Sequence, residues 1–532
     1  MPSPESNERC PVNKTELCFT PATELARMIR AKEISPLELT RTVLERIEAV
    51  NPRINAYCTL VPESALKAAR EAEEKVMKKG ELGPLHGIPL SIKDLTPTAG
   101  IRTTWGSRYY KDHVPPEDAL LVQRLKKAGA IILGKTNTPE FGIGINTTNP
   151  LFGTTLNPWD LSRTTGGSSG GAAAALAAGL GPLAHGSDLG GSLRIPASFC
   201  GVIGFRVSPG VVAKYPTYWA WDTFSIQGPM ARTVPDVALM LSVMGGFHEK
   251  DPLSVPQDFS SLPEEVKREY REKRIAWSPD LGGICPVEPE VVRICKAAAK
   301  KFEDLGCTVE EASPDFTDIM EIILGLRVVS AVFNYAHLLG VEEGIDNKFF
   351  KEFLSKGQET SAAVLAAAER NARPCGIGCR LSLRNTTSSY ARPRRCRPFR
   401  RTSYSPRLSR VRSSKIGSIP ICLPMPSPCC PCRPSPSPQG GRKVDCPWVC
   451  RSWANAWTIG RSCRLRTAWK GSPPGPTAGR RFSLLRFNWC ARWHQNFQSN
   501  ENARFQIRST KSEFRNKREK SNAKCLFLVC CF

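Results

Sequence analysis

The stretch that decides the fold runs from residue 166 to 210 and reads GGSSGGAAAALAAGLGPLAHGSDLGGSLRIPASFCGVIGFRVSPG. Two glycine-flanked serine turns, 166–171 and 188–192, bracket a segment of small residues at 172–180. Glycine loses much conformational entropy on folding, so this density of glycine is typical of backbone that turns sharply or lies close to a ligand. The serines inside the two turns, Ser168, Ser169 and Ser192, are therefore the first candidates for chemistry.

Charge divides the chain into two parts. The 532 residues carry a net charge of +25, but residues 1–371 have 41 Lys and Arg against 45 Asp and Glu, whereas residues 372–532 have 33 against 4. The first part is near neutral and long enough for a large core. The excess positive charge lies in the tail, so the charge does not indicate that the whole chain binds nucleic acid.

Cysteine content and hydropathy indicate a cytoplasmic protein. Residues 1–371 hold 7 of the 21 cysteines at irregular spacing, which suits a reducing compartment and argues against a disulfide framework. The polar start has no apolar segment of the kind that a secretory signal contains. No uninterrupted run of about 18 apolar residues occurs, so we expect no membrane span.

Periodicity predicts an α/β domain at residues 16–371, after a flexible N-terminus at 1–15. Ser35, Pro36 and Glu38 form a helix-start signature, and Asn51–Pro52 is expected to end that helix. Further helices are expected at 63–77, 116–127, 168–180 and 289–305, and strands at 88–92, 130–135, 274–278 and 308–310.

Periodicity ends near Asn371, and residues 372–532 are rich in Arg, Ser, Pro, Cys and Trp. One interpretation is a disordered basic tail. Another interpretation is a displaced reading frame. Codons for Ser (TCN), Cys and Trp begin with T, and in the displaced frame this T becomes the second base of a codon. Codons with T in the second position encode apolar residues, so a tail rich in Ser, Cys and Trp is what an apolar sequence becomes when it is read out of frame. In this frame each codon consists of the last base of one printed codon and the first two bases of the next. With a suitable choice of synonymous codons, residues 373–393 then read ALWHRVSAFFEKYDLLLCPT, an amphipathic helix followed by a strand.

A serine nucleophile needs a base within hydrogen-bond reach and donors for the oxyanion. The turn Leu189-Gly190-Gly191-Ser192 offers successive backbone N–H groups, although a plain tight turn fits it equally well. None of the six histidines has a persuasive setting. Lys93, at the end of an apolar strand, is a candidate base if burial lowers its pKa, although a salt-bridged strand-end lysine fits too; Lys135 has a similar case.

Four motifs together resemble the amidase signature family: residues 83–95 (GPLHGIPLSIKDL), 129–141 (GAIILGKTNTPEF), 157–171 (NPWDLSRTTGGSSGG) and 186–210 (GSDLGGSLRIPASFCGVIGFRVSPG). The resemblance covers about residues 16–371, and the tail resembles the family only in its displaced reading. It implies an α/β/α sandwich with a large mixed central sheet covered by helices, truncated here at its C-terminal part. It also implies hydrolysis of a small carboxylic amide through a seryl acyl-enzyme, without cofactor or metal.

The resemblance assigns roles to individual residues. Ser192 matches the nucleophile, Ser168 the bridging serine on a cis peptide, and Lys93 the base. The oxyanion hole would be formed by Leu189, Gly190, Gly191 and Ser192, and supporting residues would be Ser169, Asp188 and Arg194. The aromatic segment 215–221 lines the acyl pocket or is ordinary core or surface, two interpretations that the sequence supports equally.

Three alternatives remain open. The first is the glutamine-hydrolysing A-type subunit of a tRNA-dependent amidotransferase. The second is a catalytically dead family member whose basic tail binds nucleic acid, although no recognised module accompanies that tail and we expect no nucleic-acid partner. The third is a chain left poorly soluble and weakly active by the loss of its C-terminal part. The CCPC cluster at 429–432 lacks a second ligand pair at a zinc-like distance, and the expectation for assembly allows a homodimer.

Overall fold

The computed structural model describes residues 13–268, 271, 273–284, 286–316 and 318–372. All of them belong to one compact unit. The predicted tail at 372–532 lies outside these residues except for Ala372, and so do most of the predicted flexible residues 1–15.

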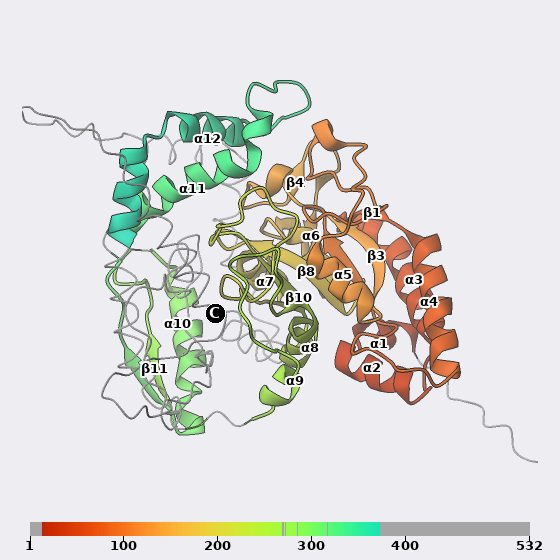
Figure 1. Cartoon of the computed structure of the whole chain (residues 1–532). Helices are drawn as coiled ribbons and strands as arrows, with labels where there is room; N and C mark the ends of the chain where they lie inside the picture. Colours follow the sequence, from red (N-terminus) through yellow and green to blue (C-terminus); the bar gives the residue numbers. More distant parts are fainter. Residues whose placement is uncertain (1–12, 269–270, 272, 285, 317, 373–532) are drawn as a thin grey trace, which may run out of the picture. The chain divides into compact units, whose positions relative to one another are not determined.

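A mixed six-stranded sheet forms the centre of the described unit (Figure 1). Its strands, in spatial order, are β1 (Tyr57–Leu60), β3 (Ile131–Thr136), β2 (Pro89–Lys93), β8 (Leu183–Asp188), β10 (Ile226–Ala231) and β9 (Ile203–Gly204). β2 runs parallel to β3 and β8, whereas the outer pairs are antiparallel. β2 is buried along its whole length, as expected of a central parallel strand.

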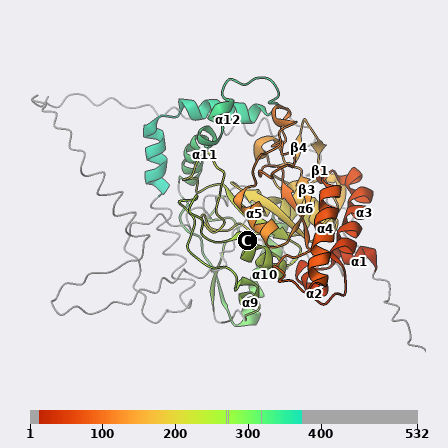
Figure 2. The same cartoon turned by 45° about the vertical axis from the view of Figure 1, so that its right-hand side comes forward.

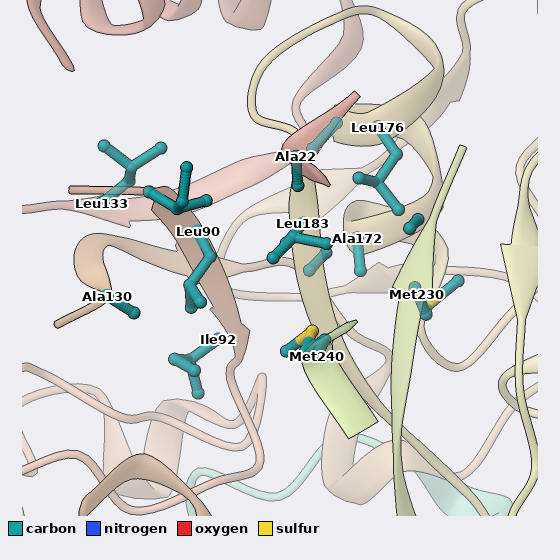
Figure 3. Close-up of a cluster of buried hydrophobic side chains, with 14 of the residues drawn as sticks. Ala22, Leu90, Ile92, Ala130, Leu133, Ala172, Leu176, Leu183, Met230 and Met240 are labelled. Atoms are coloured by element: carbon teal, nitrogen blue, oxygen red, sulfur yellow. The ribbon is translucent and has the colours of Figure 1, made fainter. Parts of the chain in front are cut away.

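Helices pack against this sheet and supply the expected α/β architecture. They are α1 (Lys14–Phe19), α2 (Ala22–Arg30), α3 (Pro36–Ile54), α4 (Pro62–Met77), α5 (Leu120–Lys127), α6 (Gly170–Ala177), α7 (Arg194–Cys200) and α8 (Val234–Met244). The core combines side chains of β2, β3, β8 and β10 with those of α2, α6 and α8, including Leu90, Leu183, Leu176 and Met240 (Figure 3). This continuous apolar cluster holds the strand ends that carry the candidate residues.

The start of α3 follows the sequence prediction, but its end does not. The Ser35 hydroxyl accepts the N–H of Glu38 at 3.0 Å, and Pro36 occupies the first turn. The helix passes the predicted stop and ends at Ile54, because a proline in the last turn removes only one donor and Asn55 then adopts a left-handed conformation with φ 51°.

Three other helices are shorter than predicted. α5 begins at Leu120 instead of residue 116, because the Asp118 carboxylate accepts the N–H of Ala99 at 2.8 Å and the N–H of Ala119 donates to Pro97 at 2.9 Å. α6 begins at Gly170, so Ser168 and Ser169 lie in the turn before it. The predicted helix at 289–305 is α10 (Pro289–Lys300) followed by a short 3-10 turn at Glu303–Leu305.

Smaller elements surround the main sheet. β11 (Arg274–Trp277) and β12 (Thr308–Glu311) form a separate parallel pair joined by α10, while β4 (Thr148–Asn149) pairs with β5 (Gly153–Thr154) and β6 (Leu156–Asn157) with β7 (Asp160–Thr164). α9 (Leu262–Glu265) is a single turn. α11 (Ile319–Tyr335) and α12 (Lys348–Glu359) lie side by side in both views (Figures 1 and 2).

The helical stretch Ile319–Leu338 is long and apolar enough to cross a membrane by length and composition alone. The sequence prediction of no membrane span overlooked it because Glu321 and Arg327 interrupt the apolar run. A core helix of a soluble protein meets the same criterion, and one face of α11 packs in small apolar clusters with Phe224 and with Phe141.

Candidate active site

Lys93 lies at the centre of the site. It is the last residue of β2, and its side chain has no exposed surface. Its Nζ atom is 2.7 Å from Oγ of Ser168, 2.9 Å from Oγ of Ser169 and 3.0 Å from Oγ of Ser187. The structure therefore brings the predicted lysine into direct contact with the first serine turn, and the interpretation of Lys93 as a salt-bridged strand-end lysine is wrong.

Burial changes the acidity of this amine. Desolvation lowers the pKa of Lys93 from 10.5 to about 7, and the negative charge of Asp188 opposes that shift. A lysine with a pKa near 7 is neutral in a large fraction of molecules at neutral pH. Such an amine can accept a proton from a neighbouring hydroxyl.

Close packing holds Ser168 against the lysine. The peptide bond between Gly167 and Ser168 is cis, as the family resemblance implies. The following glycines have no room for a side chain, because a Cβ at Gly170 would lie 2.2 Å from Oγ1 of Thr147 and one at Gly171 would lie 2.4 Å from the backbone N of Asn137. The glycine density of this turn thus permits the close approach of backbones that the sequence suggested.

Ser192 lies beside this turn. Its carbonyl oxygen accepts the N–H of Ser169 at 3.2 Å, and it is partly exposed just before α7. The hydroxyls of Ser168 and Ser192, both within the described residues, are not hydrogen-bonded to each other. The backbone contact nevertheless keeps the two serine turns adjacent.

Asp188 shapes the second turn. Its carboxylate accepts the N–H groups of Gly191 at 2.9 Å and Leu193 at 3.1 Å, and it pairs with Arg194 at 3.1 Å and Arg206 at 2.8 Å. Burial alone would raise the pKa of Asp188, but the two guanidinium groups outweigh it and hold the pKa well below its usual range. These contacts tie Asp188 and Arg194 to the second turn, and their supporting role stays a prediction.

We expect Asp188→Asn to lower the free energy of unfolding by about 3–5 kcal/mol, because two buried guanidinium groups would lose their counter-charge. Urea unfolding followed by circular dichroism measures this loss. The matched control is Asp160→Asn, since Asp160 is exposed and its ion pair with Arg163 at 3.4 Å should change stability by less than about 1 kcal/mol. Equal unfolding midpoints for the two variants would contradict the supporting role.

The predicted oxyanion hole is modified by these contacts. The N–H of Gly191 already donates to Asp188, so it is not free to serve as an oxyanion donor in the way the sequence suggested. The N–H groups of Gly190 and Ser192 have no acceptor within the part of the chain that the structure describes. Together with Leu189 at the start of the turn, they remain as candidate donors.

Two residues that contact the candidate site were not predicted. Ser187 contacts Lys93, and Arg206 binds both the carboxylate and the carbonyl of Asp188. The only sequence signal for Ser187 is its place directly before Asp188 at a strand end. Arg206 lies 18 residues from Asp188 in the chain, so no local pattern connects them.

Lys135 is fully buried but belongs to a different cluster. Its Nζ donates to the carbonyl oxygen of Thr96, and also to the hydroxyls of Thr98 and Thr103, both of which lie at 3.0 Å. Burial lowers the pKa of Lys135 to about 8. It binds the loop after β2 and contacts none of the three candidate serines, so the structure does not support it as the base.

The aromatic segment 215–221 contacts α11. The ring of Trp219 stacks on Phe333 at 4.9 Å, and that of Tyr218 lies 5.1 Å from His337. Tyr218 is 77% exposed, which identifies the tip of this segment as surface. Among the described residues, no group of three or more His, Cys, Asp or Glu side chains is arranged to hold a metal, and the CCPC cluster lies outside them.

The mixed sheet and the buried lysine–serine cluster define an α/β protein with a candidate hydrolase site, and comparison with known proteins names the family. Residues 38–375 match the family model described as Amidase, so the chain belongs to the amidase family. It is 43% identical over 305 residues to an acylamidase of Rhodococcus erythropolis, a match covering 57% of this chain and 64% of that protein. It is 41% identical over 330 residues to the A-type subunit of the glutamyl-tRNA(Gln) amidotransferase of Carboxydothermus hydrogenoformans, covering 62% and 68%.

Solved structures give the same family. A bacterial aryl acylamidase of the amidase signature family aligns with a TM-score of 0.64 and 27% identity, covering 69% of this chain and 78% of that one. The 6-aminohexanoate cyclic dimer hydrolase aligns with a TM-score of 0.63 and 30% identity, covering 70% and 78%. The chain thus spans about two thirds of the length of its curated relatives, and the expected mixed α/β fold is confirmed for the amidase part.

Proposed function

We propose that this chain is an amidase that hydrolyses a small carboxylic amide to an acid and ammonia or an amine through a seryl acyl-enzyme. The observation that carries the proposal is the fully buried Lys93 amine, 2.7 Å from the Ser168 hydroxyl, with a pKa lowered to about 7 by burial. A buried amine with hydroxyls as its near neighbours suits proton transfer better than structural pairing.

In the proposed mechanism, the Ser192 oxygen attacks the amide carbonyl carbon. As it does so, the Ser192 hydroxyl gives its proton to Ser168, and Ser168 gives its own proton to the neutral amine of Lys93. A hydroxyl can bridge in this way because it both donates and accepts. The N–H groups of Leu189, Gly190 and Ser192 stabilise the oxyanion, whereas that of Gly191 donates to Asp188 and holds the turn. The C–N bond breaks as the relay returns the proton to the departing nitrogen, and water then releases the acid by the same route.

A second candidate is the glutaminase subunit of a tRNA-dependent amidotransferase, favoured by the 41% identity to a protein of that name. The passage at 218–229 (YWAWDTFSIQGP), which differs from what the subunit generally has there, favours a free-standing amidase. Ammonia release from acetamide, phenylacetamide and L-glutamine, measured with the isolated chain, separates the two. Hydrolysis of the simple amides supports the amidase, and glutaminase activity that depends on added partner subunits would overturn it.

We expect kcat/KM for the amide to rise with pH and level off above about pH 7. The base must be neutral, so activity is lost as Lys93 becomes protonated below its lowered pKa. Initial rates at subsaturating amide between pH 5 and 9 give this profile. A flat profile, or a rising limb near pH 10, would show that an amine with a pKa near 7 is not involved.

Three further predictions remain open. A homodimer and a cytoplasmic location are expectations from the sequence. Nucleic-acid binding by the tail is the alternative whose residues lie outside those described, and salt-dependent binding by residues 372–532 would support it.

A further inference from the structure

We propose that α11 roofs the site and forms an apolar chamber in which Tyr335 selects amides that carry an aromatic ring. This inference rests on the proposed function. It adds the substrate class and names a specificity-determining residue.

One end of α11 reaches the second serine turn. Ile322 and Leu326 pack with Phe224 in a buried apolar cluster, and Leu189 packs against that cluster. The position of Phe224 is fixed because its carbonyl oxygen accepts a hydrogen bond from Arg206 at 2.9 Å. Since Arg206 also binds Asp188, this end of the helix is tied to the turn that carries the candidate nucleophile.

The other end of α11 packs against Phe141, whose neighbour Gly142 borders the first serine turn. A Cβ on Gly142 would lie 3.5 Å from Oγ of Ser168, so the backbone of this residue borders the candidate relay serine. The neighbouring Phe141 ring stacks on Phe350 of α12 at 4.3 Å and lies edge-on to Tyr335 at 5.5 Å. One helix therefore packs against neighbours of both serine turns.

The α11 side chains that pack with Phe224 and with Phe141 are apolar apart from the hydroxyl of Tyr335. Burial, followed by the nearby charge of Asp222, raises the pKa of the Tyr335 phenol, so it is neutral at physiological pH. The Tyr335 hydroxyl has no hydrogen-bond partner in the described ranges. The nearby charges are already used, because Asp222 pairs with Lys214 at 3.4 Å and Arg206 with Asp188. The guanidinium group of Arg327 on α11 lies over the Phe353 ring of α12, 5.2 Å from its centroid. A ring-bearing amide fits such surroundings better than glutamine, whose α-amino and α-carboxylate groups need free counter-charges.

The test compares kcat/KM for phenylacetamide, acetamide and L-glutamine in the full chain, with the frame-restored chain described below assayed in parallel. We expect a preference for phenylacetamide, and Tyr335→Ala should lower its kcat/KM about 10- to 100-fold, since a buried ring contact is lost. Acetamide should change less than about threefold. Tyr335→Phe keeps the ring and isolates the hydroxyl, and it should retain the preference.

The matched control is Phe349→Ala, because Phe349 is an aromatic residue of α12 that pairs with Phe353 at 5.8 Å, outside the roof. Equal losses on both amides in Tyr335→Ala, or no preference in the unmodified chain, would overturn the chamber while leaving the amidase proposal intact. Absence of hydrolysis of every amide by both chains would overturn the amidase proposal and the chamber with it.

A second inference concerns the coding of the tail and is carried by independent observations. The family match ends at residue 375, yet the 305 matched residues are only 64% of the Rhodococcus relative. The unmatched third of that relative is comparable in length to residues 373–532. We infer that one base has been lost near the codon for Asn371, so that the tail is an out-of-frame reading of the missing part.

The genetic code tests this base loss, because at several positions the displaced frame encodes the same residue whichever synonymous codons are used. In the displaced frame, the codons spanning Asp445–Cys446, Trp448–Val449 and Trp453–Ala454 are forced to be Leu, Gly and Gly, whichever synonymous codons are used. Codons spanning Pro447–Trp448, Val449–Cys450 and Ser452–Trp453 are forced to Leu, Met or Val. With a suitable choice of synonymous codons the stretch reads GGLPVGLQIVG, a glycine turn followed by an apolar strand. The printed sequence of the tail has neither the periodicity of a helix nor that of a strand.

The described surface offers a place for that segment. Met320 and Leu324, one helical turn apart on α11, are 50% and 42% exposed, and Val364 in the helical residues 362–372 is 52% exposed. Exposed apolar side chains one turn apart on a helix are typical of an interaction surface. The occupant that we assign is the segment encoded after codon 371 in the displaced frame.

Sequencing of genomic DNA and transcript across the codons for Ser361 to Ser388 tests the base loss directly, and an unbroken frame in both would overturn it. Inserting one base after codon 371 should raise the soluble fraction several-fold and slow hydrogen exchange in α11. The matched control inserts two bases and so produces the third frame. Equal solubility and exchange for the two insertions would contradict the assigned occupant.

Discussion

Replacing Ser192 by alanine is expected to lower kcat/KM for the preferred amide by at least about 10³-fold, since the acyl-enzyme cannot form without the nucleophilic oxygen. The fold should be unaffected, because the Ser192 carbonyl, not its hydroxyl, makes the contact with the N–H of Ser169. Ammonia release measures the rate. Mass spectrometry of the quenched reaction should show an acyl adduct on the peptide containing Ser192 in the unmodified chain only.

The matched control for this experiment is Ser198→Ala. Ser198 lies on α7, six residues beyond the candidate nucleophile, and it is likewise partly exposed. We expect this variant to keep its rate within about twofold. Full activity in Ser192→Ala, or an adduct on another serine, would remove Ser192 from the mechanism.

The sequence predicted the parts of this site that depend on local backbone. The glycines around Ser168 and Ser192 indicated tight turns, and such turns are present because neighbouring backbone leaves no room for a Cβ at Gly170 and Gly171. β2 was predicted from its apolar run, and burial on both faces of the sheet explains that run. Local pattern was therefore sufficient wherever the reason for a residue lay in its own turn or strand.

Contacts between distant segments were beyond local pattern. Lys93 and Lys135 end neighbouring parallel strands and looked alike in sequence, but Lys93 meets serines 75 and 76 residues away, whereas Lys135 meets threonines of the preceding loop. The use of the Gly191 N–H by Asp188 likewise depends on the third dimension. The family resemblance separated the two lysines where spacing alone left both open.

Lys93→Met is expected to reduce kcat/KM by at least about 10³-fold and to abolish the rise of activity through pH 7, since the variant has no amine to titrate. Stability gives a second readout. The unfolded amine holds a proton up to about pH 10.5 and the folded amine only up to about pH 7, so the free energy of unfolding rises by about 1.4 kcal/mol per pH unit between these values. Lys93→Met should lose that contribution.

Lys135→Met is the matched control, because Lys135 is equally buried and burial lowers its pKa to about 8. It should lose stability, since the hydroxyls of Thr98 and Thr103 would lose a buried partner, but the folded fraction should keep its turnover and its pH profile. Comparing the two variants thus distinguishes a loss of proton transfer from a loss of structural support. If both variants lose turnover equally per folded molecule, or if Lys93→Met keeps the pH-dependent limb, the base is a group other than Lys93.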